Sequence, residues 1–452
     1  MPENENMPDS TTPDATPDTA AKTPEPPQNA AGTTPETATG ETATGKPGKS
    51  QRAEKAEKTE NEKPEKAENT DKAETPQKTE KAEKVEKVEK ADKPRASRST
   101  HPEPVHSTSD RSETLRRVDG REMRLAVGNS PFPVEQTEAW ERFEEAMGRP
   151  LWGRYLYEDE GKPVAAIALY RYEMGGQSFL WAKHGPVWLK EQSPEREAHL
   201  RRLLRSVVKE RDRSVRFVRM HARYRDTDLR ELLSTITYDR TYVIDLVPKT
   251  PEKMAAVMPK DGRRAVKRAE RVAREAGCTI SDETGLSREE FDRVYEVLRE
   301  TAERDGFKPH DAEVYWTMLT SLGEGNARLF VLRKDGVPHA WDLILTSGKD
   351  AVAYYGASSN ESRTFRGAEA LDWWAACTLA QEGYRGLDLM GAGSTRVPSL
   401  YTVGQYKKRY AQHVTEVDGA WDVPVSRVIY SGMAAAKRLR DALRARRGSR
   451  EH

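Results

Sequence analysis

The fold of this chain is decided by residues 354–410, which read YYGASSNESRTFRGAEALDWWAACTLAQEGYRGLDLMGAGSTRVPSLYTVGQYKKRY. The spacing of the apolar residues predicts an amphipathic helix over residues 367–381, which ends at Gly383. The apolar stripe of this helix is formed by Leu371, Trp374 and Leu379. The pattern also predicts a short strand over residues 386–390 and a basic-aromatic strand over residues 406–410. Strand, turn, helix, strand, loop and basic strand, in this order, indicate an α/β half-domain that handles a substrate.

The first hundred residues lack the composition of a folded domain. No Ile, Leu, Phe, Trp or Tyr occurs before Leu115, and the first aromatic residue is Phe132. Such a segment cannot bury enough apolar surface to offset the entropy of ordering, so residues 1–118 are predicted to form a long disordered tail. Within it, residues 51–93 nearly repeat Glu-Lys-Ala and Glu-Lys-Val, which is typical of a solvated tether. A docking arm for a partner is the alternative.

Charge, cysteine content and hydropathy exclude several classes of protein. Residues 1–100 carry 17 of the 75 Lys and Arg and 21 of the 74 Asp and Glu, so the remainder is mildly basic. The only cysteines, Cys278 and Cys377, exclude a disulfide framework and a cysteine-based zinc site. The first residues lack the regions of a signal peptide, and the longest apolar run, residues 164–169, is too short to span a bilayer. We therefore expect a soluble cytoplasmic protein, which is still free to make peripheral contact with the inner membrane surface.

Helices and strands recur in the same order in two halves of the remaining chain. Each half is predicted to place helical sequence before a run of strands, followed by a longer helix and a further strand. In the first half this order resembles the sheet-and-helix fold of GNAT-type acetyltransferases. The recurrence suggests two related half-domains.

Basic residues gather on one face of a helix predicted over residues 260–276. Arg264, Lys267 or Arg268, and Arg271 lie on this face, at i, i+3 or i+4, and i+7 spacing. A row of cations suits phosphate, which a guanidinium group binds in a bidentate way. A solvated face that pairs with nearby glutamates is the alternative.

A second basic helix is predicted over residues 426–447, near the end of the chain. Its apolar side is formed by Ile429, Met433, Ala436, Leu439 and Leu443, and Lys and Arg occupy most of the other side. Such a helix suits tRNA phosphates or anionic lipid head groups, and packing on the first domain is the alternative.

Residues 355–407 carry a resemblance to the Fem family of non-ribosomal aminoacyltransferases, which build peptidoglycan interpeptide bridges. The matching features are Tyr355-Gly356-Ala357-Ser358, Arg363, a tryptophan-containing helix that ends in Gly383, Leu387-Asp388 before Gly391, and the pair Tyr406-Lys407. The resemblance extends from about residue 134 to about residue 425 and is clearest after residue 241. The chain departs from the family pattern at Glu144 and Glu145, where some members have a lysine, and at Tyr406, where the family usually has phenylalanine. It also has Val187-Trp188-Leu189 after Gly185-Pro186, where an acidic residue is common.

The resemblance implies a fold and a division into domains. It implies two tandem GNAT-like domains of the α/β class, over residues 119–238 and 239–420, without the long helical arm that some members carry. It also implies that residues 421–452 form a basic C-terminal helix that packs back on the first domain.

The resemblance further implies roles for single residues. Lys407 is expected to stabilise the transition state, with Tyr406 as its stacking neighbour near the 3′ end of an aminoacyl-tRNA. Arg264 or Arg268, with Lys267 beside them, is expected to bind the diphosphate of the peptidoglycan precursor. The other expected substrate-binding residues are Tyr355, Ser358 and Arg363. A basic edge strand is the alternative for Lys407, and a turn with a packed aromatic ring is the alternative for Tyr355.

We therefore expect an enzyme that transfers an amino acid from aminoacyl-tRNA to the stem-peptide side-chain amine of a peptidoglycan precursor. The acceptor is lipid II or a UDP-linked pentapeptide. Neither a metal nor an organic cofactor is implied, and the histidines show no metal-ligand spacing. No Gly-x-Ser-x-Gly elbow occurs that would indicate a serine nucleophile. The alternatives are a GNAT-type acyltransferase that uses acyl-CoA, and a non-catalytic tRNA or cell-envelope scaffold that has kept the fold.

Overall fold

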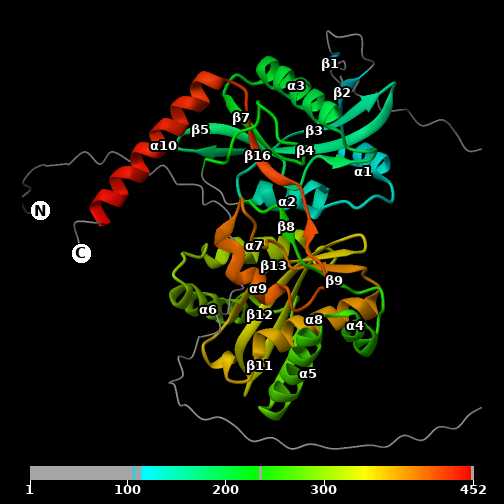
Figure 1. The fold of residues 1–452 in the computed structure, drawn as a ribbon, viewed down its shortest axis with the longest axis vertical. Coiled ribbons are helices and arrows are strands. Elements are labelled where there is room, and N and C mark those ends of the chain that lie inside the picture. The colour runs from blue at the N-terminus through cyan, green and yellow to red at the C-terminus, as the bar shows by residue number, and fades with distance from the viewer. Residues whose placement is uncertain (1–104, 107–112, 234–236, 449–452) are drawn as a thin grey trace, which may run out of the picture. The chain divides into compact units, whose positions relative to one another are not determined.

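The computed structural model describes residues 105–106, 113–233 and 237–448 (Figure 1). Most of the segment predicted to be a disordered tail lies outside the described residues. Residues 114–118, which the prediction included in that tail, instead form strand β2. Leu115 and Val118 on this strand are both buried and belong to two different core clusters, one on each face of the sheet.

The first sheet has the strand order β1-β2-β3-β4-β5-β7-β16, with β6 paired to β4. Its strands are β1 (Val105–His106), β2 (Thr114–Val118), β3 (Leu151–Asp159), β4 (Lys162–Met174), β5 (Gln177–Trp181), β6 (Val187–Trp188), β7 (Val215–Ala222) and β16 (Gly419–Pro424). The neighbours are antiparallel except β5 and β7, which are parallel and are joined through helix α3 (Pro194–Arg211).

The second sheet has the strand order β10-β11-β12-β13-β14-β9. Its strands are β9 (Val243–Asp245), β10 (Cys278–Asp282), β11 (Ala327–Lys334), β12 (Val337–Ser347), β13 (Asp350–Ser358) and β14 (Gly386–Asp388). Here β13 and β14 are the parallel pair, joined through α8 (Gly367–Glu382). They pair over residues 350–352 of β13, and among the described strands the remaining residues of β13 have no partner on that side.

The two halves repeat one order of elements. β2-α1-α2-β3-β4-β5-α3-β7 in the first half corresponds to β10-α6-α7-β11-β12-β13-α8-β14 in the second, apart from the short β6. The helices are α1 (Gly120–Val127), α2 (Glu138–Ala146), α6 (Arg288–Asp305) and α7 (Ala312–Leu322). Each sheet is completed by an antiparallel strand from elsewhere in the chain, β16 in the first and β9 in the second. The prediction of two tandem GNAT-like domains is confirmed, while the domain boundaries stay predictions.

The remaining elements surround the second sheet or close the chain. They are β8 (Arg240–Thr241), α4 (Pro251–Val257), α5 (Lys260–Glu275), α9 (Tyr401–Lys407), β15 (Thr415–Glu416) and α10 (Arg427–Gly448). Among the helices that the structure describes, none has the length and apolar character needed to cross a bilayer.

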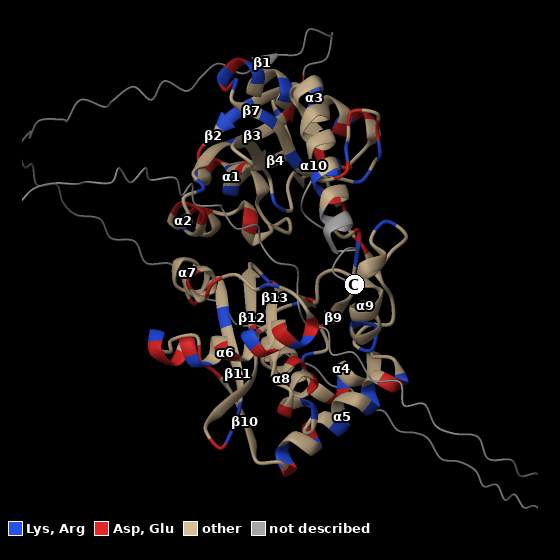
Figure 2. Ribbon diagram, turned by 90° about the vertical axis from the view of Figure 1, so that its left-hand side faces the viewer, with Lys and Arg blue, Asp and Glu red and all other residues tan. Residues whose placement is uncertain are grey.

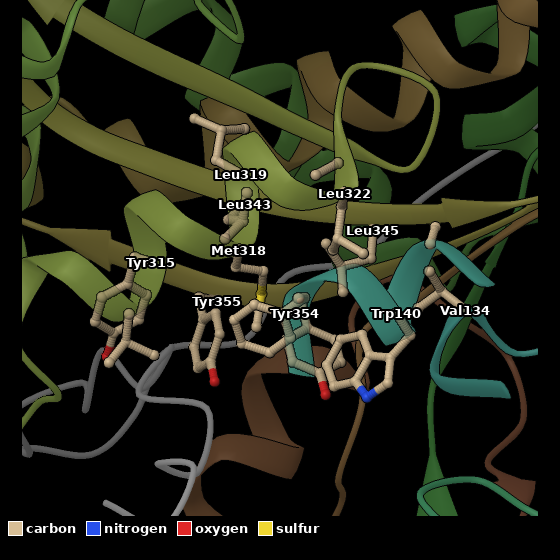
Figure 3. Packing of buried hydrophobic residues seen from close by; sticks show 14 of the residues in the cluster. Val134, Trp140, Tyr315, Met318, Leu319, Leu322, Leu343, Leu345, Tyr354 and Tyr355 are labelled. Atoms are coloured by element: carbon tan, nitrogen blue, oxygen red, sulfur yellow. The ribbon is translucent and has the colours of Figure 1, made fainter. Parts of the chain in front are cut away.

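Three clusters of buried apolar residues fill the space between the helices and the sheets. One lies between α3 and the first sheet, and another lies between the second sheet and α5 with α8. The largest cluster joins the facing sides of both sheets, where the equivalent helices α2 and α7 pack together. Figure 3 shows Trp140 of α2 beside Tyr354 of β13, whose ring centroid lies 5.9 Å away.

Two local predictions need correction. Residues 406–410 are not a strand, because Tyr406 and Lys407 end helix α9. Trp374, predicted in the apolar stripe of α8, is only partly buried, whereas its neighbour Trp373 is fully buried. α8 is covered by the sheet on one side and by α5 on another, so more than one stripe of its surface is apolar. The predicted end of this helix at Gly383 is confirmed, with a left-handed φ of 93°.

Candidate active site

Lys407 lies at the last residue of α9, in a position fixed by two close backbone approaches. A Cβ atom on Gly393 would lie 2.5 Å from the Tyr401 nitrogen, and one on Gly404 would lie 3.2 Å from the Gly393 nitrogen. Only glycine lets the loop after β14 come this near to α9. The glycine turn that follows β14 therefore packs closely against α9, the helix that ends in Lys407.

The ammonium group of Lys407 is buried and held by main-chain oxygens. Its side chain donates hydrogen bonds of 3.1 Å to the Met390 oxygen and 3.0 Å to the Gly391 oxygen. Burial lowers the pKa of Lys407 to about 8, against the opposing effect of the Asp388 and Asp372 carboxylates. An ammonium has three N–H donors, so one remains unused by these two bonds.

The turn that holds Lys407 is organised by Asp388, the last residue of β14. Its carboxylate accepts hydrogen bonds from the Thr241 hydroxyl and from the Met390 N–H, the latter at 2.6 Å. Met390 adopts a left-handed φ of 57°, which is unusual for a residue other than glycine. Burial raises the pKa of Asp388, although both hydrogen bonds favour its charged form.

Tyr406 faces inward, toward a buried acid pair. Its hydroxyl donates to Asp372 and lies 3.0 Å from the hydroxyl of Tyr410, which also donates to Asp372 at 3.1 Å. Asp372 in turn lies in hydrogen-bond contact with Asp342 of β12. Burial, followed by the charge of Asp372, raises the pKa of Asp342 well above its usual range. This network fixes α9 against α8 and the second sheet.

The predicted phosphate-binding cations lie on α5, a helix on which Figure 2 shows Lys and Arg in blue. Arg264, Lys267 and Arg268 are all exposed. The first turn of α5 approaches the 407–410 segment so closely that a Cβ on Gly262 would lie 1.7 Å from the Arg409 oxygen. The charge of Arg268 acts on Glu369 of α8, which also accepts hydrogen bonds from Arg366 and Arg409.

Tyr355, Ser358 and Arg363 are not brought together with Lys407 by any contact among the described residues. A bulge places Tyr354 and Tyr355 on the same face of β13, because Leu343 pairs with Tyr355 and the next residue of β12 pairs with Ala353. Both rings pack in the cluster shared by the two sheets. The Ser358 main chain bonds to Thr301 of α6, and Arg363 is exposed in the turn after β13.

The structure adds a buried charged group from the first domain that sequence reasoning missed. Lys183 lies 3.6 Å from Glu144, which also pairs with Arg149 and accepts a bond of 2.5 Å from the Tyr172 hydroxyl. Burial lowers the pKa of Lys183 to about 8, although Glu144 opposes the shift. We refer to Lys183, Glu144 and Arg149 as the first-domain charge cluster.

Aromatic rings surround Lys183. Its nitrogen lies 4.9 Å from the ring centroids of both Trp140 and Trp181, and the indole nitrogens of both are buried without a hydrogen-bond partner among the described residues. Figure 3 shows the Trp140 nitrogen and the Tyr354 and Tyr355 hydroxyls on one side, away from the leucines of the cluster. We refer to these groups, which are buried where the facing sides of the two sheets meet, as the polar lining.

Glu135 and a histidine pair link this lining electrostatically to the Lys407 turn. His184 stacks on His221 at 4.8 Å, and its Nε2 lies 3.7 Å from a Glu135 oxygen. Burial lowers the pKa of each histidine to about 4, and burial raises the pKa of Glu135. The charge of Glu135 also contributes to the raised pKa of Asp388, after the larger effect of burial.

The missed residues gave little local signal. Lys183 and His184 follow strand β5 after Ala182 and precede Gly185-Pro186, so they lie where a strand of the sheet ends. Glu135 and Glu144 are two carboxylates among many. Among the described residues, no group of three His, Cys, Asp or Glu side chains has an arrangement that would hold a metal ion.

The chain is similar to several known proteins. A family model described as an acetyltransferase (GNAT) domain matches residues 260–408, which include α5, α8 and Lys407. No curated protein matches the sequence. The solved structure of FemX covers 71% of this chain and 99% of its own, with 15% identity and a TM-score of 0.56.

Two further solved structures are similar at lower scores. L-PGS from Bacillus licheniformis covers 72% of this chain and 97% of its own, with 14% identity and a TM-score of 0.44. A tandem GNAT protein from the clavulanic acid biosynthesis pathway covers 70% and 99%, with 12% identity and a TM-score of 0.41. The likeness to FemX shows that this chain shares the fold of that protein, and the resemblance to the Fem family is confirmed at the level of the fold.

Proposed function

We propose that this protein is a Fem-like aminoacyltransferase of the cytoplasm. It moves an amino acid from the 3′ ester of an aminoacyl-tRNA to the stem-peptide side-chain amine of a peptidoglycan precursor, either lipid II or a UDP-linked pentapeptide. The observation that carries the proposal is the buried Lys407 ammonium, held by two main-chain oxygens and left with one N–H, in a domain of acyltransferase fold.

The proposed reaction needs positioning and charge stabilisation more than a protein nucleophile. The acceptor nitrogen attacks the ester carbonyl carbon, so a C–N bond forms and the C–O bond to the tRNA ribose breaks. The amine loses a proton, and the ribose oxygen takes one up to leave as a hydroxyl group. Negative charge develops on the carbonyl oxygen, and the unused N–H of Lys407 donates to it.

The acceptor is proposed to bind between the cations of α5 and the polar lining of the two domains. Arg264, Lys267 and Arg268 are exposed, and their helix packs against the residue two positions after Lys407. We assign the precursor's diphosphate to these cations. Tyr355, Ser358 and Arg363 are kept as proposed contacts to more distant parts of the substrate.

A transfer assay tests the proposal. Pooled radiolabelled aminoacyl-tRNAs are offered with lipid II or the UDP-linked pentapeptide, with and without ribonuclease. We expect label in the acceptor that ribonuclease abolishes and Lys407→Met strongly reduces. Lys408→Met is the matched control, because Lys408 is the next residue and is exposed. Label that persists in Lys407→Met at the wild-type rate would remove Lys407 from the mechanism.

The match of a GNAT family model to residues 260–408 favours one alternative, acyl transfer from acyl-CoA. The chain lacks the Gln/Arg-x-x-Gly-x-Gly/Ala turn that binds pyrophosphate in those enzymes. The same acceptors are therefore offered with labelled acyl-CoA. Ribonuclease-resistant label from acyl-CoA alone would replace the aminoacyl-tRNA proposal, and no transfer from either donor would favour a scaffold.

A further inference from the structure

The described side chains of helix α10 contact the first domain near the start of the helix. The Tyr430 hydroxyl donates hydrogen bonds of 2.9 Å to the Glu231 oxygen and 2.9 Å to Asp422. Met433 and Ala434 pack against the same domain, and the following turns are mostly exposed. In Figure 1 this red helix starts beside β7 and continues away from the first sheet.

The exposed part of α10 carries an apolar stripe. Val428 is 84% exposed, Leu439 63% and Leu443 50%. At about 100° per residue these three lie within about 60° of one another around the helix, opposite the side that holds Tyr430. Single exposed leucines are common on protein surfaces, but an aligned row on one helix marks an interaction surface.

Cations flank this stripe. Residues 427–448 contain seven Lys and Arg and a single acidic residue, Asp441. Asp441 accepts a hydrogen bond of 2.8 Å from Lys437. The helix therefore carries a large excess of positive charge. An apolar stripe bordered by cations is typical of a helix that lies in the interface of an anionic membrane.

A basic groove adjoins the first turn of α10. It has a volume of about 620 Å³ and is lined by Arg202, Arg205, Ser206 and Lys209 of α3 and by residues 424–427. No carboxylate lines it. Arg205 pairs with Asp228 at 3.5 Å, whereas Arg202, Lys209 and Arg427 have no ion-pair partner in the part of the chain that the structure describes. Unpaired cations grouped around a groove attract a phosphate.

We propose that α10 and this groove form one docking surface for a membrane that contains anionic phospholipid. Val428, Leu439 and Leu443 enter the boundary between head groups and acyl chains, and the groove takes a lipid phosphate. RNA would use the cations but leaves the apolar stripe in water, so the stripe favours a membrane. The inference goes beyond the proposed function and does not depend on it.

The test measures binding of the full chain to vesicles, without any activity assay. Phosphatidylcholine vesicles are compared with vesicles that also contain phosphatidylglycerol. We expect binding only to the anionic vesicles. The double variant Leu439→Glu/Leu443→Glu is expected to lose at least ~10-fold in the partition coefficient for each leucine. Arg202→Gln/Lys209→Gln is expected to lose about 25-fold, because each cation near such a surface contributes about fivefold.

Two matched controls are available on other elements. Leu125→Glu changes a leucine that is 72% exposed on α1, and Arg293→Gln/Arg299→Gln removes two exposed cations from α6. Both are expected to keep wild-type binding. In a separate chain, Leu439→Trp gives a fluorescence signal that is expected to shift to shorter wavelength when anionic vesicles are added.

Three results would overturn the proposal. One is the absence of binding to anionic vesicles by the wild-type chain. Another is a loss of vesicle binding in Leu125→Glu that equals the loss in Leu439→Glu/Leu443→Glu. The third is vesicle binding that survives Leu439→Glu/Leu443→Glu while Leu439→Trp shows no shift. Binding of tRNA that depends on Arg202 and Lys209, without vesicle binding, would assign the groove to RNA instead.

Discussion

Lys407 and Met390 are joined by a hydrogen bond of 3.1 Å from the lysine ammonium to the main-chain oxygen of a residue in left-handed conformation. That conformation costs on the order of 1–2 kcal/mol for a residue other than glycine. The bond from the Met390 N–H to Asp388 offsets part of this cost. The end of β14, the strained turn and the lysine therefore form one unit.

Removal of the Lys407 charge is expected to abolish most of the transfer activity. Lys407→Met keeps most of the side-chain volume but removes the donor to the developing oxyanion, which lowers the rate by about 10²–10³-fold. The loss of two hydrogen bonds and the relief of a buried charge act in opposite directions on stability. Initial rates and thermal unfolding are measured together, and a rate within twofold of wild type would contradict the assignment.

Activity and stability are expected to respond to pH in opposite directions above neutrality. Burial lowers the pKa of Lys407 from 10.5 to about 8, so between these values the unfolded chain binds more protons than the folded one. The free energy of unfolding therefore rises with pH across this range, by on the order of 3 kcal/mol from this residue. The transfer rate falls over the same range, because it requires the charged ammonium.

The comparison of wild type with Lys407→Met isolates this effect. Lys183 also has a pKa lowered to about 8 by burial, so the variant is expected to keep part of the rise in stability. Denaturant unfolding at a series of pH values is the measurement. A wild-type stability that falls as pH rises from 8 to 10 would contradict the buried, charged lysine.

Gly262 is expected to be required for the packing of α5 against the segment that follows Lys407. A Cβ at this position would lie 1.7 Å from the Arg409 oxygen, so Gly262→Ala forces the backbone apart. We expect a loss of about 1–3 kcal/mol in unfolding free energy and a lower transfer rate. Gly432→Ala on α10 is the control, since a Cβ there meets nothing within 4 Å, and alanine favours a helix.

The exposed cations of α5 are expected to act on substrate binding. Arg264→Ala and Arg268→Ala each remove one charge-assisted contact to a diphosphate, which raises KM about 10-fold or more and leaves kcat nearly unchanged. Arg271→Ala is the matched control on the same helix, because Arg271 pairs with Glu275 at 2.9 Å. Equal effects of all three changes would indicate a general charge effect.

Glu144 is expected to be a stability residue. Glu144→Ala leaves Arg149 and Lys183 buried without their shared carboxylate, which costs about 3–5 kcal/mol. The neighbouring Glu145 is exposed, so Glu145→Ala is expected to change the unfolding free energy by less than about 0.5 kcal/mol. Equal stability of the two variants in denaturant titrations would contradict the buried pairing.

Helices and strands were predictable from the sequence where the residues that define them are close together in the chain. The end of α8 at Gly383 followed from the preference of glycine for a left-handed residue, and the recurring order of helices and strands indicated two tandem domains. The class of the fold and its likeness to the Fem family were therefore accessible from the sequence.

Contacts between distant residues explain what the sequence did not predict. The 406–410 segment has aromatic residues that suit a strand, but Tyr406 and Lys407 end helix α9 and residues 408–410 form a turn. Lys183 is separated from Glu144 by 39 positions, and only the folded chain shows that they meet. The bulge that turns Tyr354 and Tyr355 to one face likewise arises from pairing with β12.

Strand β16, which completes the first sheet, is synthesised after the whole second sheet. β16 pairs with β7, yet about 200 residues, including the whole second sheet, separate the two strands in the chain. While the ribosome makes the second domain, the edge of β7 has no partner on that side. The first domain therefore reaches its complete hydrogen bonding only after the second has been translated, so a chain that stops before residue 419 leaves this edge open to pair with other chains.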